Sequence, residues 1–138
     1  MTLPTYATLK LEMIEPHVLL ITLNRPDVAN AINTQMGHDM LDLWRRLTDD
    51  AGDVRCAILT GSGDKIFCAG GDLKERNGMT KQQWVAQHEL FERAYFGRFG
   101  VELPEIRAVL VNLHTAVIGP RGRARIDKDL NLVIDIQP

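Results

Sequence analysis

The chain has 138 residues, of which 45% are hydrophobic and 25% are charged, and its formal net charge is −2. This length and composition fit one ordinary globular domain spanning residues 1–138. A net charge near zero gives no general attraction to nucleic acid or an anionic membrane, and no run of about 18 apolar residues predicts a membrane span. We therefore expect neither nucleic acid nor membrane as a partner.

The N-terminus and the cysteines predict a cytoplasmic protein. Residues 1–5 lack the basic-then-apolar pattern of a signal peptide. Cys56 and Cys68 are not spaced as metal ligands, so we expect two reduced thiols and no bound metal.

Two strands are predicted near the N-terminus. Residues 7–12 alternate between apolar and polar side chains, and residues 17–23 contain a short apolar run. Glu15-Pro16 supplies a turn between them. Pro26 ends the second strand, because proline cannot donate to a sheet ladder.

An amphipathic helix is predicted next, with Asn33 or Thr34 as its N-cap. A continuous apolar run at residues 56–60 then predicts a central strand covered on both faces. The order strand, helix, strand predicts a right-handed crossover and a parallel strand pair. The apolar positions at helical spacing are Met36, Met40, Leu43, Trp44 and Leu47.

A second helix is predicted to begin at Thr80, because Thr80 and Gln83 have the spacing of a capping box. His88 falls on its apolar stripe, and we interpret it as a packed or edge histidine rather than a catalytic base. The stripe consists of Trp84, His88, Phe91 and Tyr95.

The C-terminal residues alternate with the period of a strand. Arginines occupy every second position from 121 to 125, and leucine or isoleucine every second position from 130 to 136. On a strand the arginines share one solvated face, whereas on a helix they would spread around the axis. We predict a hairpin at about residues 121–136, with a turn at 127–129 and packed by its leucines and isoleucines.

The segment at residues 67–72 places two adjacent glycines and a potential helix cap, Asp72, after a strand. Adjacent glycines let the main chain approach a ligand closely and can direct N–H groups into a pocket. Acyl-transfer or enolate chemistry requires such donors. An ordinary tight turn explains the same residues, and the segment alone favours that turn.

Other nucleophile and cofactor patterns are weaker. Ser62 does not lie in the G-x-S-x-G elbow of serine hydrolases, and Gly61 and Gly63 lack the further glycines of a dinucleotide site. No histidine or lysine is placed by sequence to activate Cys68, so we interpret it as a small buried residue.

Three motifs follow one another along residues 7–96. Residues 21–26 end in L-N-R-P and are followed by N-A-I-N at residues 30–33. Residues 57–63 read A-I-L-T-G-S-G, and residues 67–73 match F-x-A-G-x-D-L. In this order and spacing they resemble the N-terminal half of the enoyl-CoA hydratase/isomerase (crotonase) family.

The resemblance implies an α/β fold, a partial crotonase-like (ClpP/crotonase) β-β-α spiral with two amphipathic helices and the C-terminal hairpin. Residues 7–96 would be crotonase-like and residues 101–138 a divergent tail. The implied activity is hydration or isomerisation of a 2-enoyl-CoA in fatty acid metabolism, through an enolate held in an oxyanion hole. Coenzyme A would arrive as part of the acyl-CoA substrate with no separate cofactor, and the family's trimers imply a homo-oligomer.

Carried over by position, the resemblance also assigns site residues. The N–H of Gly71 would be one oxyanion donor, and Ala69 would lie near the adenine. Asp72, Leu73 and Lys74 would line the acyl-CoA site together with Gly71.

The chain departs from the family pattern after residue 108. The family's second oxyanion segment opens a buried helix, and here residues 109–122 resemble it only distantly. Gly119 is the nearest second donor, because Pro120 has no N–H. Ala124 stands nearest to a catalytic glutamate, and the second glutamate of the hydratases has no counterpart in residues 1–138. We expect negligible hydratase activity and leave open a truncated product or a non-catalytic acyl-CoA-binding or assembly protein.

Overall fold

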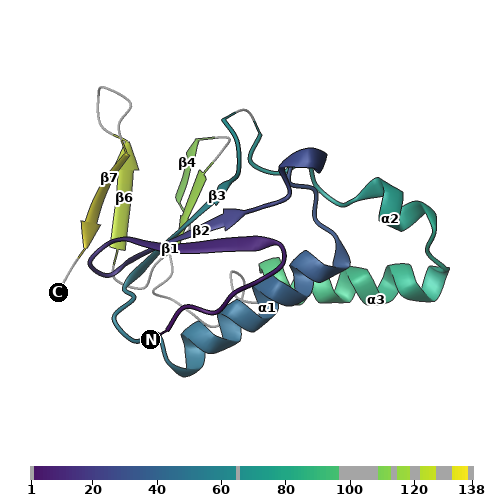
Figure 1. Ribbon diagram of the computed structural model, residues 1–138, viewed down its shortest axis with the longest axis horizontal. Helices are drawn as coiled ribbons and strands as arrows, with labels where there is room; N and C mark the ends of the chain where they lie inside the picture. The colour runs from purple at the N-terminus through teal and green to yellow at the C-terminus, as the bar shows by residue number, and fades with distance from the viewer. Residues whose placement is uncertain are drawn as a thin grey trace.

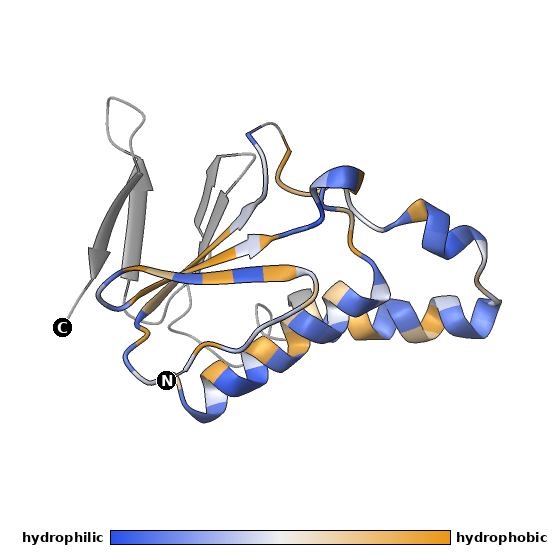
Figure 2. Ribbon diagram, in the orientation of Figure 1, coloured by the Kyte–Doolittle hydropathy of each residue, from blue (hydrophilic) through white to orange (hydrophobic). Residues whose placement is uncertain are grey.

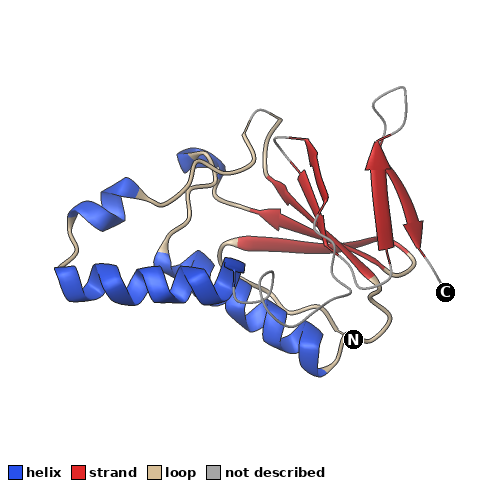
Figure 3. Ribbon diagram, turned by 180° about the vertical axis from the view of Figure 1, so that it is seen from behind, coloured by secondary structure: helices blue, strands red, loops and turns tan. Residues whose placement is uncertain are grey.

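The computed structural model describes residues 2–64, 66–96, 109–112, 115–118, 122–126 and 132–136. Figure 1 shows a sheet with α1 running along it and α3 extending beyond the sheet from the place where it meets α1, and Figure 3 shows the same arrangement from behind. The elements in chain order are β1 (Leu9–Glu15), β2 (Val18–Leu23), the 3-10 turn η1 (Pro26–Val28), α1 (Thr34–Asp49), β3 (Cys56–Gly61), α2 (Leu73–Asn77), α3 (Lys81–Phe91), the π-helical turn η2 (Glu92–Phe96), β4 (Val109–Asn112), β5 (Thr115–Ile118), β6 (Gly122–Ile126) and β7 (Leu132–Ile136).

The main sheet has five strands in the order β1-β2-β3-β5-β4. Strands β2 and β3 are parallel, with Leu20 opposite Ile58, which confirms the predicted parallel pair. The other neighbouring strands of this sheet are antiparallel. Because β2 and β3 run the same way, the loops that follow them leave from the same edge of the sheet. The candidate site lies where those two loops meet.

Helix α1 provides most of the core packing against the sheet. Its side chains Met36, Met40 and Leu43 are fully buried, as are Leu19 and Ile21 of β2. Burying one such side chain stabilises a fold by about 1.5–3 kcal/mol. Figure 2 shows the hydrophobic residues of α1 alternating with hydrophilic ones, as the predicted stripe requires. The N–H of Met36 donates to Oδ1 of Asn33 over 2.9 Å, so Asn33 is the N-cap.

Helix α3 differs from the prediction in the face that it buries. The capping box of Thr80 and Gln83 is present. However, Trp84 is 44% exposed and the side chain of His88 is 54% exposed. The ring of His88 stacks on Trp84 with 5.4 Å between centroids, and its Nε2 lies 3.2 Å from Oε1 of Glu92. Of the predicted stripe, Phe91 is buried as expected, and the other buried positions of α3, Gln87 and Leu90, lie outside the stripe.

The first strand and the C-terminal strands agree with the sequence predictions in part. Strand β1 begins at Leu9 rather than residue 7, because the N–H and hydroxyl of Thr8 both donate to the carboxylate of Asp39. The antiparallel pair β6 and β7 confirms the strands of the predicted hairpin, with Arg123 opposite Asp135. Its turn at 127–129 lies outside the described residues. Strands β4 and β5 were not predicted, and they occupy the region where the family pattern would have opened a helix.

Within the described part of the chain, no helix is long and apolar enough to cross a membrane. The same residues contain no group of three or more histidines, cysteines or acidic side chains placed to hold a metal ion.

Candidate functional site

Two loops meet at the edge of the sheet, one after β2 and one after β3. The N–H of Ala69 donates to the carbonyl of Ala29 over 3.0 Å. The N–H of Ile32 donates to the carbonyl of Gly70 over 2.7 Å, and that of Asp72 to the carbonyl of Ile32 over 2.9 Å. These bonds fix the segment from Ala69 to Asp72 along the neighbouring loop like a short parallel strand.

Asn30 joins the two loops through its side chain, which is 1% exposed. Its Oδ1 accepts from the N–H of Arg25 over 3.1 Å and from Oγ of Ser62 over 2.7 Å. Its Nδ2 donates to the carbonyls of Ser62 and Ile66 over 2.9 and 3.2 Å. The backbone of Asn30 has a φ of 55°, a left-handed conformation that asparagine tolerates better than most residues.

The two loops approach so closely at Gly61 that no side chain fits there. A β-carbon at this position would lie 2.2 Å from the carbonyl oxygen of Phe67 and 2.8 Å from Nδ2 of Asn30. Gly61, the last residue of β3, is therefore required by packing between the loops, not by a ligand.

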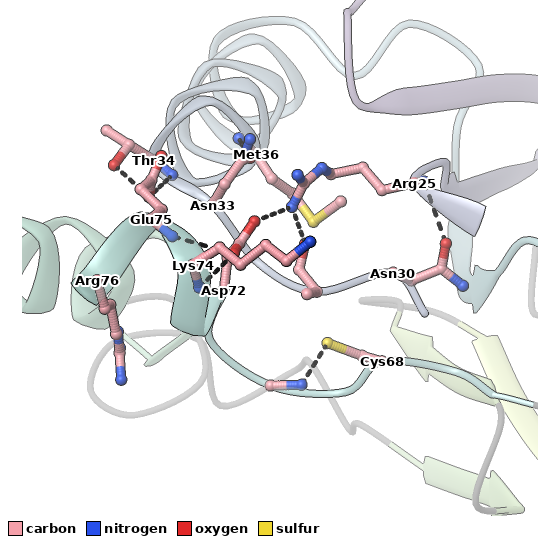
Figure 4. A network of polar contacts seen from close by, with 12 residues as sticks. Arg25, Asn30, Asn33, Thr34, Met36, Cys68, Asp72, Lys74, Glu75 and Arg76 are labelled. Atoms are coloured by element: carbon pink, nitrogen blue, oxygen red, sulfur yellow. Dashed lines mark hydrogen bonds and ion pairs between the residues drawn. The ribbon is translucent and has the colours of Figure 1, made fainter. Parts of the chain in front are cut away.

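An ion pair holds the far end of the site segment. Nη1 of Arg25 donates to the carbonyl of Ala31 over 2.7 Å and to Oδ2 of Asp72 over 3.0 Å (Figure 4). The other oxygen of Asp72 accepts from the N–H groups of Lys74 and Glu75, so Asp72 caps α2 as the sequence predicted. The N–H of Glu75 and the guanidinium of Arg25 hold the pKa of the Asp72 carboxyl below its usual value. Asp72 is therefore an ionised anchor, not a proton donor.

Gly70 and Gly71 form the turn between these anchors. Gly70 has a φ of 89°, a backbone angle that residues with a side chain rarely adopt. In the parallel bridge, Ile32 bonds to Gly70 and Asp72, so the N–H and carbonyl of Gly71 face the opposite side of the segment. The N–H of Gly71 donates to no acceptor within the described ranges. The N–H of Gly71 is thus a donor with no acceptor among the described residues, and hydrogen bonds hold the residues on either side of it in place.

Cys68 lies next to this turn but is not activated. Its Sγ accepts from the N–H of Gly70 over 3.4 Å, and burial raises the pKa of its thiol. A raised pKa keeps the sulfur protonated near neutral pH, which agrees with the prediction that Cys68 is not an activated nucleophile, but its side chain is half-buried rather than buried.

A second polar cluster connects α1, α2 and α3. Oε1 of Glu75 accepts from the N–H and the hydroxyl of Thr34, each over 2.9 Å, and also from Nε2 of Gln87. Oε1 of Gln87 in turn accepts from Nε of Arg76 over 3.1 Å. Sequence patterns gave no role to Arg76 or Gln87, because their partners lie on other elements. A groove of about 710 Å3 between α1 and α3 borders this cluster and is not lined by the segment from Ala69 to Lys74.

The structure therefore brings one contiguous part of the predicted site together. Ala69 is exposed, Gly71 and Asp72 are partly buried, and Leu73 is 77% exposed at the start of α2 with Lys74 beside it. Gly119, the predicted second donor, lies outside the described residues. Arg25 and Asn30 stood in the sequence motifs, but only the three-dimensional contacts reveal that they clamp the glycine turn.

Comparisons with known proteins agree with the sequence motifs. The profile of the Enoyl-CoA hydratase/isomerase family matches residues 13–109. YngF of Bacillus subtilis is 42% identical over 77 residues, covering 56% of this chain and 29% of that protein. Enoyl-CoA hydratase EchA19 of Mycobacterium tuberculosis is 50% identical over 58 residues, covering 42% of this chain and 21% of that protein.

The fold comparison gives the same result. The crystal structure of enoyl-CoA hydratase from Bacillus anthracis superposes with a TM-score of 0.57 at 35% identity, covering 60% of this chain and 32% of that one. The chain thus spans less than a third of the length of the curated relatives YngF and EchA19.

Proposed function

The chain belongs to the enoyl-CoA hydratase/isomerase family, and from this premise we propose that it binds acyl-CoA thioesters at Ala69–Lys74 with the thioester oxygen on the N–H of Gly71. The parent reaction is hydration or isomerisation of a 2-enoyl-CoA, in which the thioester oxygen gains negative charge as an enolate forms. Coenzyme A enters as part of the substrate. The N–H of Gly71 would stabilise that developing charge.

The observation that supports this proposal most is the direction of the Gly71 N–H. It faces away from Ile32 and donates to no acceptor in the described part of the chain. Main-chain bonds at Gly70 and Asp72 and the ion pair from Arg25 to Asp72 hold the segment rigid on both sides. A donor held in advance needs little reorganisation when charge develops, and losing one such donor costs about 2.7–4 kcal/mol in the transition state.

A pair of variants tests the donor without requiring turnover. Gly71→Pro removes the N–H and adds a β-carbon, whereas Gly71→Ala adds only the β-carbon. In either variant the β-carbon meets the flexible end of Arg76 at 2.7 Å, and proline in addition replaces the N–H by a ring carbon on the nitrogen. The ligand is acetoacetyl-CoA, whose enolate carries the negative oxygen that the site would stabilise.

We expect the Gly71→Pro variant to bind this enolate about 100-fold more weakly than Gly71→Ala does. Circular dichroism of both variants checks that the fold is retained. Equal affinities of two folded variants would remove Gly71 from the site.

A second candidate function is acyl-CoA binding without turnover. It is favoured by Ala124, which stands nearest to a catalytic glutamate and lies on β6 opposite Ile134. A methyl group cannot transfer a proton, and general acid–base groups contribute about 10²–10⁴-fold to a rate. A crotonyl-CoA hydration assay discriminates the two candidates. Turnover at ordinary enzyme rates establishes the hydratase, and binding without turnover supports the second candidate.

A further inference from the structure

Arg76 of α2 is held in place by three side chains of α3. Its Cζ lies 6.0 Å from the ring centroid of Trp84 and 5.9 Å from that of Phe91. Its Nε donates to Oε1 of Gln87 over 3.1 Å, and Gln87 is 3% exposed. In Figure 4 the side chain extends away from the ion pair between Arg25 and Asp72. The guanidinium is therefore held by side chains of α3, not by the ion pair at the α2 cap.

The guanidinium lies directly beside Gly71. Its Cζ, Nη2 and Nε are 2.7, 2.9 and 3.0 Å from the point that a β-carbon of Gly71 would occupy. Any side chain at residue 71 would displace it. The glycine thus serves two purposes: it presents its own N–H, and it leaves room for a cation next to that N–H.

The charge of Arg76 has no counter-ion among the described residues. No described carboxylate lies within 4.0 Å of it, and Oε1 of the adjacent Glu75 is already shared by Thr34 and Gln87. Neither Nη atom donates to an acceptor in those same ranges. A partly buried guanidinium is stable when an anion accepts its remaining donors, and a carboxylate matches its planar fork with two parallel bonds.

We propose that Arg76 is a specificity-determining residue that binds a carboxylate carried on the acyl group of the ligand. The inference rests on the proposed function, because that function places the thioester oxygen on the N–H of Gly71 and the acyl chain beside Gly71. A short acyl chain ending in a carboxylate then reaches the Nη atoms of Arg76, which donate to no acceptor among the described residues. The ligand class is an acyl-CoA of a dicarboxylic acid rather than of a simple fatty acid.

Two ligands of equal chain length isolate this contact. Glutaryl-CoA and pentanoyl-CoA both carry five acyl carbons and the same coenzyme A, and they differ by the terminal carboxylate. Isothermal titration of the 138-residue chain with each ligand gives their affinity ratio. We expect glutaryl-CoA to bind about 10- to 100-fold more tightly, the range for charged hydrogen bonds.

Three variants assign that preference to Arg76. Arg76→Met keeps the apolar stem and should reduce the preference to about one, whereas Arg76→Lys keeps the charge without the fork and should retain part of it. Arg93→Met is the matched control, since Arg93 is exposed on η2 and loses the same charge. It should retain the full preference. If Arg76→Met does not fold, the wild-type ratio and Arg76→Lys still test the proposal.

Each other outcome overturns the inference. Equal affinities of the wild-type chain for the two ligands would exclude carboxylate recognition. If Arg76→Met loses the same affinity for both ligands, Arg76 acts on the thioester oxygen or on the fold, not on the acyl carboxylate. If neither acyl-CoA binds more tightly than free coenzyme A, the proposed function fails and this inference fails with it. Binding without preference overturns this inference alone.

Discussion

The start of α1 packs against the end of α3, yet α1 buries its predicted apolar face, whereas α3 buries Phe91 but leaves Trp84 and His88 exposed. On α1 the stripe Met36, Met40, Leu43 and Trp44 is buried against the sheet. On α3, Trp84 and His88 remain on the surface while Gln87 is buried. The difference arises because Gln87 bridges Glu75 and Arg76, two residues of α2 next to the glycine turn. Hydrophobic spacing positions the core helix α1, whereas a polar network orients α3, which packs beside the candidate site.

The largest expected contrast comes from the two tryptophans. Trp44 is 8% exposed, and its Nε1 donates to the carbonyl of Ala94 over 3.0 Å, so it joins α1 to η2. Trp44→Ala should destabilise the chain by about 3–5 kcal/mol. Urea unfolding followed by circular dichroism measures the change. A loss well below this range would mean that α1 is not the principal core helix.

The next contrast opposes hydrophobic spacing to the polar network. If the buried face of α3 were simply apolar, Gln87→Leu would stabilise it. We expect the opposite, a loss of about 1–3 kcal/mol, because Glu75 and Arg76 lose a buried partner. Gln82→Leu is the control, since Gln82 is exposed on the same helix and should change stability little. A Gln87→Leu chain as stable as wild type would show that the network does not orient α3.

A smaller effect is expected in how stability depends on pH, through the carboxylate of Asp72. The pKa of Asp72 is lowered in the folded chain, so its contribution is present above the unfolded value of about 3.9 and is lost as the pH falls through the folded value. We expect Asp72→Asn to be about 1 kcal/mol less stable than wild type at neutral pH, because asparagine still caps α2 but carries no charge. The difference should decrease as the pH falls below the unfolded value and disappear once the pH is below the folded value. Urea titrations of both proteins across this range measure it, and a constant difference would contradict the ionised anchor.

The smallest expected effect concerns the exposed tryptophan. Trp84 stacks on His88 and faces Arg76 at the surface. Trp84→Ala should cost only about 0.5 kcal/mol, the value of an exposed cation–π contact. The comparison with Trp44→Ala therefore measures how differently α1 and α3 are packed. Equal losses for the two tryptophans would contradict the assignment of the α3 surface.

Sequence patterns predicted the elements whose signals are local. The N-cap at Asn33, the capping box at Thr80 and the alternation of residues 121–136 each depend on neighbours within a few positions. The parallel pairing of β2 and β3 followed from chain order alone. Strands β4 and β5 were not predicted because a short apolar run without a clear period does not distinguish a strand from a helix.

The candidate site was predicted as a segment but not as a structure. The F-x-A-G-x-D-L motif located Gly71 and Asp72. It could not reveal that Asn30 joins the loops through Ser62 and Ile66, since those contacts cross more than 30 residues of chain. It also could not place Arg76 beside Gly71, because that position depends on how α3 is turned.

The most direct test of the account is the amide signal of Gly71 itself. In a nitrogen-15 NMR titration of the chain with acetoacetyl-CoA, a new hydrogen bond to the thioester oxygen should move the Gly71 amide proton downfield in step with binding. Free coenzyme A should leave it unchanged. Gly63, exposed in the loop after β3 with open space around it, is the internal control and should not shift. Saturable binding of acetoacetyl-CoA with the Gly71 amide unmoved would contradict the proposed site.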